Sequence, residues 1–438
     1  MSAQHPGEAH APAAVAAPGA TVRQIAFLAA LGLAVGLLAG FGASIFIKVE
    51  HALTHLLWTD IPEALGQEQA PWWLTITLLV IGALIVYAAK KLPGGGGHSP
   101  LQGLGVDIGP REVVSVLIAA LGGLCFGAAL GPEAPLMAVG TALGAMAFRD
   151  PSNPVRTVMM IAGAMAAIGA IFGNPLVTTI LLLEMALIAG AAMASPAVLL
   201  PALAALASGY TLQVGVQDWS GLGQEAFAVQ GLPAYPNVRL VDLAIAVPAA
   251  AIVAVIAIAV RLLAERLELR AKANPLAVIM ASAALIAISA VVVSEITGGS
   301  LELVLFSGQS AMPEYFALTS AGSALVILIG RFISYTLSMG GGFRGGPIFP
   351  AVAMGAIVAT ALSLVISGAS LSALAATGIA AAMAAALRMP FSAALLAVLL
   401  TSSAGGAITV PAIIGALVGM LVRLAAEVRL DNLAPAQH

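Results

Sequence analysis

The sequence has few charges and only one cysteine. Of its 438 residues, 8% are charged and 61% are hydrophobic, whereas a soluble domain carries about 25% charged residues. This scarcity excludes an ordinary soluble domain and predicts a chain that lies in a bilayer. The lone Cys125 excludes an internal disulfide framework and is interpreted as a small core residue. A net charge of −3 without a basic stripe gives no reason to expect nucleic acid as a partner.

The motifs of membrane-embedded hydrolases are missing as well. The sequence has no His-Glu-x-x-His, no Gly-x-Ser-x-Gly and no paired aspartates inside apolar segments. We therefore expect no enzyme, no cofactor and no metal site. A cation- or solute-coupled secondary transporter would need carboxylates around its cation, and only Glu133 and Glu184 lie deep in apolar sequence. That class of transporter is kept as an alternative.

Apolar segments separated by glycine or proline cover most of the chain. Several, such as 134–148 and 391–403, are clearly shorter than the ~20 residues that a perpendicular membrane helix needs. Partial, tilted or re-entrant helices explain them, because protein or a water-filled cavity can receive the freed backbone groups. The prediction is an all-α, multi-pass protein of the cell (inner or plasma) membrane, in contact with the lipid bilayer.

One membrane domain is expected at 22–427, between two short tails. Residues 1–21 lack a basic start and a compact apolar core, so they are interpreted as a disordered cytoplasmic tail rather than a signal peptide. Residues 428–438 are expected to form a C-terminal tail, and no soluble regulatory domain is expected at either end. Basic residues near the span ends, including Lys90 and Arg423, place both termini in the cytoplasm by the positive-inside rule.

An internal repeat divides this domain. Gly131-Pro132-Glu133-Ala134-Pro135 returns 215 positions later as Gly346-Pro347-Ile348-Phe349-Pro350, and other glycines and prolines repeat at the same spacing. The halves are therefore about 22–215 and 239–427. Repeats with Gly/Pro-interrupted segments at matching places indicate a transporter fold with its binding site at the repeat interface. The spacing alone does not tell whether the halves are inverted or parallel.

Three Gly/Pro-rich breaks precede apolar stretches that we expect to be helical, at 94–100, 131–135 and 345–350. A proline in the first helical turn costs no hydrogen bond, and the other first-turn N–H groups and the helix dipole attract an anion. Three such helix starts around one point would bind an anion without any lysine or arginine. A fixed cation would hold the anion too tightly for rapid passage. Ordinary helix breaks are the alternative interpretation.

Glu133 is the only carboxylate within these breaks. A charge at bilayer depth costs several kcal/mol unless it is paired, solvated or functional. Its repeat mate is Ile348, so the repeated frame itself needs no charge. A carboxylate at a positive helix end can take the place of a permeating anion, and protonation or a swing of the side chain would free that place. We therefore interpret Glu133 as a gate, with a structural N-terminal charge as the alternative.

These stretches together resemble motifs of the CLC chloride channel and transporter family. Residues 131–135 are similar to its G-K/R-E-G-P motif, 346–350 to G-x-F-x-P and 96–100 to G-S-G-I-P. The stretch from Asn174 to Met185 resembles the family's N-x-P-L … L-E-E helix. The resemblance, to a bacterial member without CBS domains, covers essentially the whole membrane region. It implies two inverted repeats of tilted and partial helices, a homodimer with one pore per subunit, and an anion pathway gated by Glu133.

The resemblance also implies which residues bind the anion. They belong to the three breaks: Gly97, His98, Ser99, Gly131, Glu133, Ala134, Gly346, Ile348 and Phe349. Gly97 stands where the family has the serine that holds the central anion, and Ser99 or a backbone N–H is the expected substitute. No tyrosine lies near 404–406, where the family's pore tyrosine is expected. His98 is interpreted as a loop or vestibule histidine, with titration near neutral pH as the alternative.

Two residues bear on proton coupling. The family's proton-coupled exchangers carry a second glutamate directly after the one matching Glu184, and this chain has Met185 there. Glu184 is interpreted as a structural capping or pairing carboxylate, with a substitute proton site as the alternative. We expect transport of chloride or a similar small anion, channel-like or weakly proton-coupled. The alternatives are a proton-coupled chloride or fluoride antiporter of the same family and an unrelated inverted-repeat transporter.

Overall fold

The structure, a computed structural model, describes residues 21–433 except 104, 149 and 224–227, and this part is helical with no strand longer than an isolated bridge. Its α-helices, in chain order, are α1 Val22–His55, α2 Ile61–Ala64, α3 Trp72–Ala89, α4 Val113–Leu124, α5 Glu133–Met146, α6 Pro154–Phe172, α7 Pro175–Ala189, α8 Pro196–Val214, α9 Leu240–Ala273, α10 Pro275–Thr297, α11 Met312–Phe316, α12 Ala321–Gly340, α13 Ile348–Val365, α14 Leu371–Leu387, α15 Pro390–Leu400 and α16 Thr409–Leu433.

Helix length separates the elements into two groups. Within the described residues, nine helical segments are long and apolar enough to cross a membrane, whereas α4, α7, α14 and α15 are apolar helices of only 10–17 residues. Helices this short leave backbone groups at membrane depth that must be satisfied inside the protein. The prediction of an all-α membrane protein with partial helices is confirmed.

Capping residues and prolines fix where α6 and α7 begin. The side chain of Asn174 accepts a hydrogen bond from the N–H of Leu176, and Pro175 occupies the first position of α7. Asn153 makes the equivalent contact with Val155 at the start of α6. A proline at this position has the backbone angle that a helix requires and lacks only an N–H that would be unpaired anyway. The Asn-Pro pairs therefore end one helix and start the next within a few residues.

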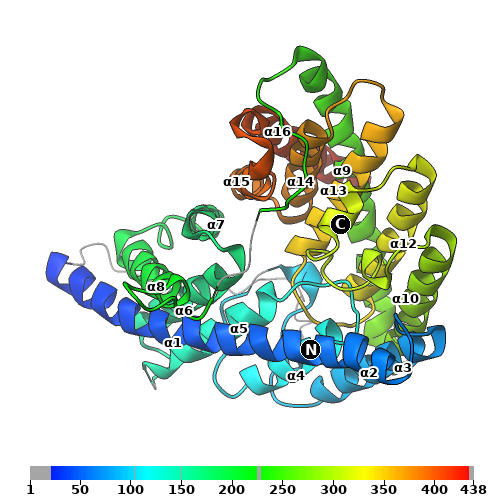
Figure 1. The fold of residues 1–438 in the computed structure, drawn as a ribbon. Coiled ribbons are helices and arrows are strands. Elements are labelled where there is room, and N and C mark those ends of the chain that lie inside the picture. Colours follow the sequence, from blue (N-terminus) through cyan, green and yellow to red (C-terminus); the bar gives the residue numbers. More distant parts are fainter. Residues whose placement is uncertain (1–20, 104, 149, 224–227, 434–438) are drawn as a thin grey trace.

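The second half of the chain repeats the first element by element. At the 215-residue spacing, α4, α5, α6, α7 and α8 correspond to α12, α13, α14, α15 and α16, and α1 corresponds to α9. Their packing repeats too, since α5 contacts α6 as α13 contacts α14, and α1 contacts α8 as α9 contacts α16. In Figure 1, α6, α7 and α8 form one group, α13 to α16 form another, and α1 runs along the edge of the molecule. The two inverted repeats are confirmed as the basis of the fold.

Glycines set the same close helix contact in each half. A Cβ added at Gly140 of α5 would collide with the carbonyl oxygen of Gly163 on α6, and one added at Gly355 of α13 would collide with that of Gly378 on α14. These four positions are repeat mates in pairs. Small residues allow membrane helices to approach until their backbones touch. The resulting van der Waals packing stabilises the helix pair, because the hydrophobic effect does not drive helices together in lipid. The glycine spacing in the sequence therefore reflects a repeated helix pair.

The chain ends differ in part from the expectation. The predicted N-terminal tail, 1–21, lies outside the described residues except for Thr21, whose side chain caps α1 by accepting from the N–H of Gln24. Residues 428–433 of the predicted C-terminal tail belong to α16, which continues to Leu433. Residues 434–438 lie outside the described part.

The glycine contact can be tested with Gly140→Ala. The added methyl group has only the backbone of α6 to meet, so it must push α5 away and should cost about 1–3 kcal/mol of stability. Gly322→Ala, in the first turn of α12, is the matched control because its Cβ has only the Ser320 hydroxyl nearby, at 3.6 Å. Thermal unfolding in detergent should show a lower melting temperature for Gly140→Ala alone. Equal melting temperatures would contradict the contact.

Candidate functional site

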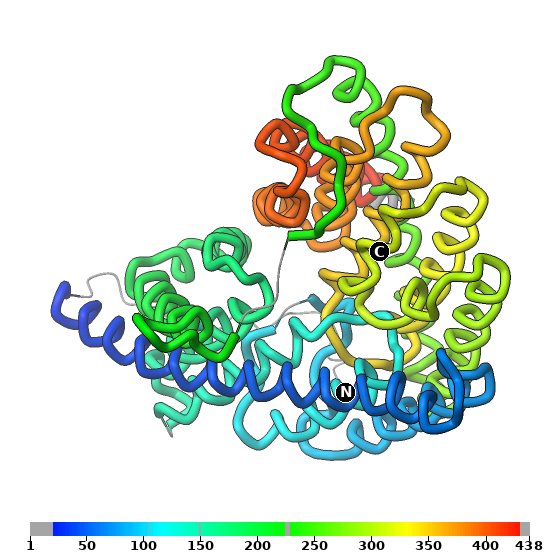
Figure 2. Tube along the Cα trace, in the orientation of Figure 1, coloured from blue at the N-terminus to red at the C-terminus, as the bar shows by residue number. Residues whose placement is uncertain are grey.

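The two copies of the Gly-Pro-x-x-Pro frame touch each other through their first residues. The N–H of Gly131 donates to the carbonyl oxygen of Gly346 at 2.8 Å, and the N–H of Gly346 donates back to the carbonyl of Gly131 at 2.6 Å. Figure 2 traces the chain through both halves, coloured by residue number. Because the two glycines are repeat mates, the contact lies on the axis that relates the repeats. The starts of α5 and α13 therefore meet at the repeat interface.

Glu133 reaches from this junction to the other helix. Its side chain is fully buried, and its Oε1 accepts a hydrogen bond of 2.9 Å from the N–H of Phe349, in the first turn of α13. Its Oε2 is buried and has no hydrogen-bond partner among the described residues. A carboxylate at a helix N-terminus gains from the exposed N–H groups and the helix dipole. One carboxylate oxygen is thus bound by α13, and the other has no hydrogen-bond donor among the described residues.

Two cavities approach Glu133 from opposite sides. A cavity of about 590 Å³ reaches Pro347, and its wall carries Arg261 and Arg423. A second, of about 600 Å³, reaches Pro132, the repeat mate of Pro347, and its wall carries Glu302. We call them the basic vestibule and the acidic vestibule, and the positive-inside rule places the basic vestibule at the cytoplasmic face. The fully buried Glu133 lines neither cavity, but it directly follows Pro132 in the chain.

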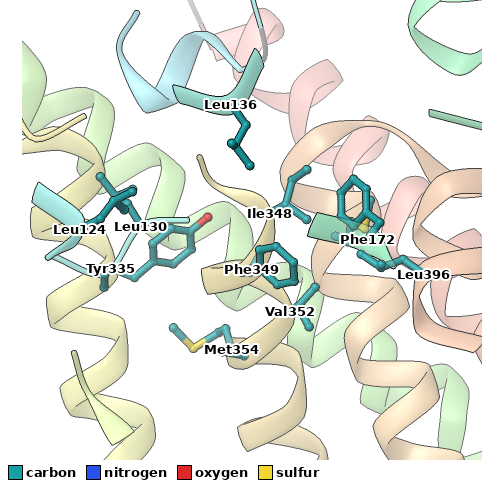
Figure 3. Close-up of a cluster of buried hydrophobic side chains, with 14 of the residues drawn as sticks. Leu124, Leu130, Leu136, Phe172, Tyr335, Ile348, Phe349, Val352, Met354 and Leu396 are labelled. Atoms are coloured by element: carbon teal, nitrogen blue, oxygen red, sulfur yellow. The ribbon is translucent and has the colours of Figure 1, made fainter. Parts of the chain in front are cut away.

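The start of α13 is enclosed by large side chains. Figure 3 shows Ile348 and Phe349 with Phe172 and Leu396 on one side and Tyr335 on the other. The Tyr335 hydroxyl donates to the carbonyl oxygen of Pro347 at 2.9 Å, and the Phe172 and Phe349 rings lie 6.0 Å apart. Tyr335 comes from α12 and lies outside the three Gly/Pro-rich breaks. A buried tyrosine at the helix start therefore exists, although none occupies 404–406.

The first break does not begin a helix, so that prediction is wrong. Residues Pro100–Gln102 form only a short 3₁₀ turn, and the next helix, α4, begins at Val113. The physical reason is the run Gly94–Gly97, in which all four residues have positive φ and the chain folds back on itself. The N–H groups there are already engaged, since Gly97 donates to the carbonyl of Gly94 at 2.9 Å and Ser99 donates to the side chain of Gln102 at 3.0 Å.

The three breaks nevertheless line one small cavity. Its volume is about 20 Å³, and its wall takes residues from each break: Gly97 and His98 from the first, Ala134 and Pro135 from the second, and Gly345 from the third. The N–H groups of Gly131 and Gly346 each donate to the carbonyl oxygen of the other glycine, so neither is free to bind an anion. Of the predicted donors, only the N–H of Phe349 faces Glu133 with a hydrogen bond of its own.

Arg344 also lines this cavity, so the expectation of a site without lysine or arginine is wrong. The residue precedes Gly345 in the third break, and its Nε is buried without a hydrogen-bond partner among the described residues. A basic residue directly before a Gly-Gly-Pro break was a signal that the sequence carried. It was missed because the cavity brings it beside His98, which is far away in the sequence.

Glu184 caps a helix of the other repeat. Its two carboxylate oxygens accept from the N–H groups of Phe391 and Ser392, at 2.8 and 2.7 Å, at the start of α15. The neighbouring Met185 lines the basic vestibule. Both buried carboxylates of the first repeat therefore bind the N-terminus of a partial helix in the second repeat.

His98 lies outside the membrane-spanning helices and pairs with Asp107. Its Nε2 lies 3.1–3.2 Å from the two carboxylate oxygens. The hydrogen bond to Asp107 raises the pKa of His98 above its ordinary value of 6.5, against the opposing effect of burial. The imidazole therefore keeps its positive charge to a higher pH than a free histidine and loses it as the pH rises through the raised pKa.

A family model described as "Voltage gated chloride channel" matches residues 98–424, which include all but Gly97 of the residues assigned above to the anion pathway. This chain belongs to the voltage-gated chloride channel (CLC) family. Its fold and membrane location follow from that membership, and the family is one of membrane anion transporters and channels rather than of enzymes. The resemblance drawn from the sequence motifs is confirmed.

Curated relatives of this CLC protein include the "Putative ion-transport protein YfeO" of Salmonella newport (strain SL254), 27% identical over 344 residues that cover 71% of this chain and 74% of the relative. The same-named protein of Salmonella paratyphi A (strain ATCC 9150 / SARB42) is 26% identical over equal coverage.

Solved CLC structures share the fold. A slow cyanobacterial Cl⁻/H⁺ antiporter superposes with a TM-score of 0.75 at 18% identity, covering 96% of this chain and all of its own. A CLC-type fluoride/proton antiporter gives a TM-score of 0.69 at 18% identity, covering 93% and 98%. A eukaryotic CLC transporter gives 0.65 at 17% identity, covering 92% and 72%.

The His98–Asp107 contact predicts a titration that Asp107→Asn should shift. Without the carboxylate, the pKa of His98 should fall toward 6.5, because the neutral amide no longer favours the imidazolium. Titration of the imidazole by NMR should show the lower midpoint. Asp150→Asn, which removes a carboxylate bonded to Ser152 instead, is the control and should leave the midpoint unchanged. Identical midpoints in wild type and Asp107→Asn would rule out the pairing as the cause.

Proposed function

We propose that this chain transports chloride or a similar small anion, and that Glu133 is its gate. The observation that carries the proposal is the hydrogen bond from the Phe349 N–H to the Glu133 carboxylate, next to the prolines that the two vestibules reach, Pro132 and Pro347. A backbone N–H at a helix start is a donor that an anion can use as well as a carboxylate can. Chloride and the carboxylate thus compete for one place.

The unsatisfied Oε2 of Glu133 supports a gate rather than a permanent cap. A buried carboxylate oxygen without a hydrogen-bond donor costs free energy. The buried, charged position of the side chain is therefore only slightly more stable than a protonated or an outward-facing one. Protonation would remove the charge that binds it to α13, and a swing into the acidic vestibule past Pro132 would return it to water. Either event leaves the N–H of Phe349 to a permeating anion.

In this proposal the anion passes the lining residues of all three breaks. Coordination comes from the N–H groups of Ile348 and Phe349, with Gly131 and Gly346 fixing their position. Ala134 and the first-break residues Gly97, His98 and Ser99 form the wall on the cytoplasmic side. The positive charge of Arg344, at that wall, draws the anion inward from the cytoplasm.

We propose channel-like or weakly proton-coupled transport. Glu184 is engaged by two N–H groups of α15, which supports a structural role for it. Met185 cannot carry a proton at the wall of the basic vestibule. A proton-coupled chloride or fluoride antiporter is the second candidate, favoured by two similar structures that are described as such antiporters. A homodimer with one pore per subunit accompanies either candidate, as the family resemblance implies.

Neutralising the gate is the direct experiment. Anion efflux from liposomes, recorded together with internal pH, should lose its pH dependence in both Glu133→Gln and Glu133→Ala. Flux at neutral pH should rise, by about tenfold in Glu133→Ala, since a lost charge-assisted hydrogen bond is worth roughly 1.5–3 kcal/mol. Glu302→Gln, in the acidic vestibule, is the matched control and should keep the pH dependence. Unchanged flux and pH dependence in both Glu133 variants would refute the gate.

Glu184→Gln separates the two candidates. The amide can accept only one of the two N–H groups of α15, so the melting temperature should fall, in line with a loss of about 1–3 kcal/mol. If the role is structural, the ratio of protons to anions moved by the folded protein should not change. A coupling ratio that collapses in Glu184→Gln while anion flux persists would favour the antiporter instead.

A further inference from the structure

A second cationic cavity lies beside the anion pathway at the cytoplasmic ends of the helices. Its volume is about 260 Å³, and it is separate from the basic vestibule. Three cations line it: Lys90 after α3, Lys272 near the end of α9, and Arg344 in the third break. Glu268, one turn before Lys272, is the carboxylate in its wall, and Ser99 of the first break completes the inner end.

The charges in this cavity do not balance. Lys272 is matched by Glu268, whose Oε2 lies 3.3 Å from its Nζ. Among the described residues, no carboxylate lies within the 4.0 Å of an ion pair from Lys90 or Arg344. Burial and the nearby Arg344 together lower the pKa of Lys90 to about 8, although Glu268 acts in the opposite direction. Lys90 and Arg344, which are both partly buried, therefore face one cavity whose only carboxylate among the described lining residues, Glu268, forms its ion pair with Lys272.

Arg344 has a buried hydrogen-bond donor, its Nε, without a partner among the described residues. Its Nη1 donates to the carbonyl of Phe343 at 3.3 Å, whereas its Nε is buried without a partner. A buried N–H of a charged group is costly to leave unsatisfied. A ligand acceptor in the cavity would satisfy it, in the planar geometry for which guanidinium groups suit phosphate oxygens.

The size of the cavity selects among anions. A single chloride would leave most of 260 Å³ empty and could contact only one or two of the three cations. A phosphate group offers several acceptor oxygens and up to two negative charges, which match the two unpaired cations. Because the cavity opens at the cytoplasmic ends of α3 and α9, the phosphate could belong to a soluble molecule or to a lipid headgroup of the inner leaflet.

The geometry points to a phosphate-binding site formed by Lys90, Arg344 and Lys272, which regulates the anion pathway through Arg344. The regulatory part rests on the proposed function. Arg344 lines both this cavity and the small cavity of the three breaks. A bound phosphate neutralises the guanidinium and thereby removes the positive charge that draws permeating anions toward Glu133. Phosphate occupancy therefore reduces anion flux.

Binding can be measured without transport. Purified protein in neutral detergent, at constant ionic strength set with sodium gluconate, is melted over a series of inorganic phosphate concentrations. A ligand that binds only the folded state raises the melting temperature in a saturable way. Lys90→Gln should raise the half-saturating phosphate concentration at least about tenfold, and Glu268→Gln should lower it, because it removes the competing carboxylate. The control is Arg270→Gln, which replaces an exposed arginine on α9, the helix of Glu268, and should leave the half-saturating phosphate concentration unchanged.

A parallel series distinguishes the two sources of phosphate. Dihexanoyl phosphatidic acid is compared with dihexanoyl phosphatidylcholine and with glycerol 3-phosphate. A Lys90-dependent shift with phosphatidic acid alone assigns the site to a lipid headgroup, and one with the soluble phosphates assigns it to a soluble ligand. Should Lys90→Gln fail to fold, Lys272→Gln takes its place. No shift with any phosphate in the wild type, or equal shifts in wild type and the folded variant, overturns the site while leaving the proposed gate untouched.

Discussion

The exchange of hydrogen bonds between Gly131 and Gly346 is the contact on which the proposed anion pathway depends. It joins two repeat mates at the point where α5 and α13 begin, so the N-termini of both partial helices are fixed relative to each other. Partial helices at membrane depth are tolerated only where their backbone groups are satisfied by protein or water. The repeat supplies that satisfaction by pairing each frame with the other.

The two copies of the Gly-Pro-x-x-Pro frame differ in charge, because the first carries Glu133 where the second carries Ile348. Pro132 and Pro347 end the two vestibules on opposite sides, as mates in an inverted repeat should. Only the first copy carries a carboxylate, and this carboxylate crosses to the Phe349 N–H of the second copy. Glu184 of α7 makes the same kind of contact with α15, two helices further on, and both of its carboxylate oxygens accept a hydrogen bond rather than one. In the proposed mechanism, this difference in hydrogen bonding lets the Glu133 side chain move, whereas Glu184 stays in place.

Much of the fold and part of the site could be predicted from the sequence. The 215-residue spacing gave the halves, and the Asn-Pro and Gly-Pro pairs marked the helix starts, because those signals are local. Glu133 stood out because its repeat mate Ile348 acts as an internal comparison. The loop at Gly94–Gly97 was misjudged because a helix start and a glycine run of positive φ look alike in composition. Arg344 and Tyr335 were missed because their importance comes from contacts between distant segments.

The central claim is that Glu133 and a permeating anion compete for the N–H of Phe349. Crystals of wild type and Glu133→Gln grown in bromide, compared by anomalous diffraction, test it most directly. The account predicts bromide at hydrogen-bond distance from the Phe349 N–H in Glu133→Gln and a carboxylate there, without bromide, in the wild type. Bromide beside Phe349 in the wild type with the carboxylate still in place, or no bromide near Phe349 in the variant, would contradict it.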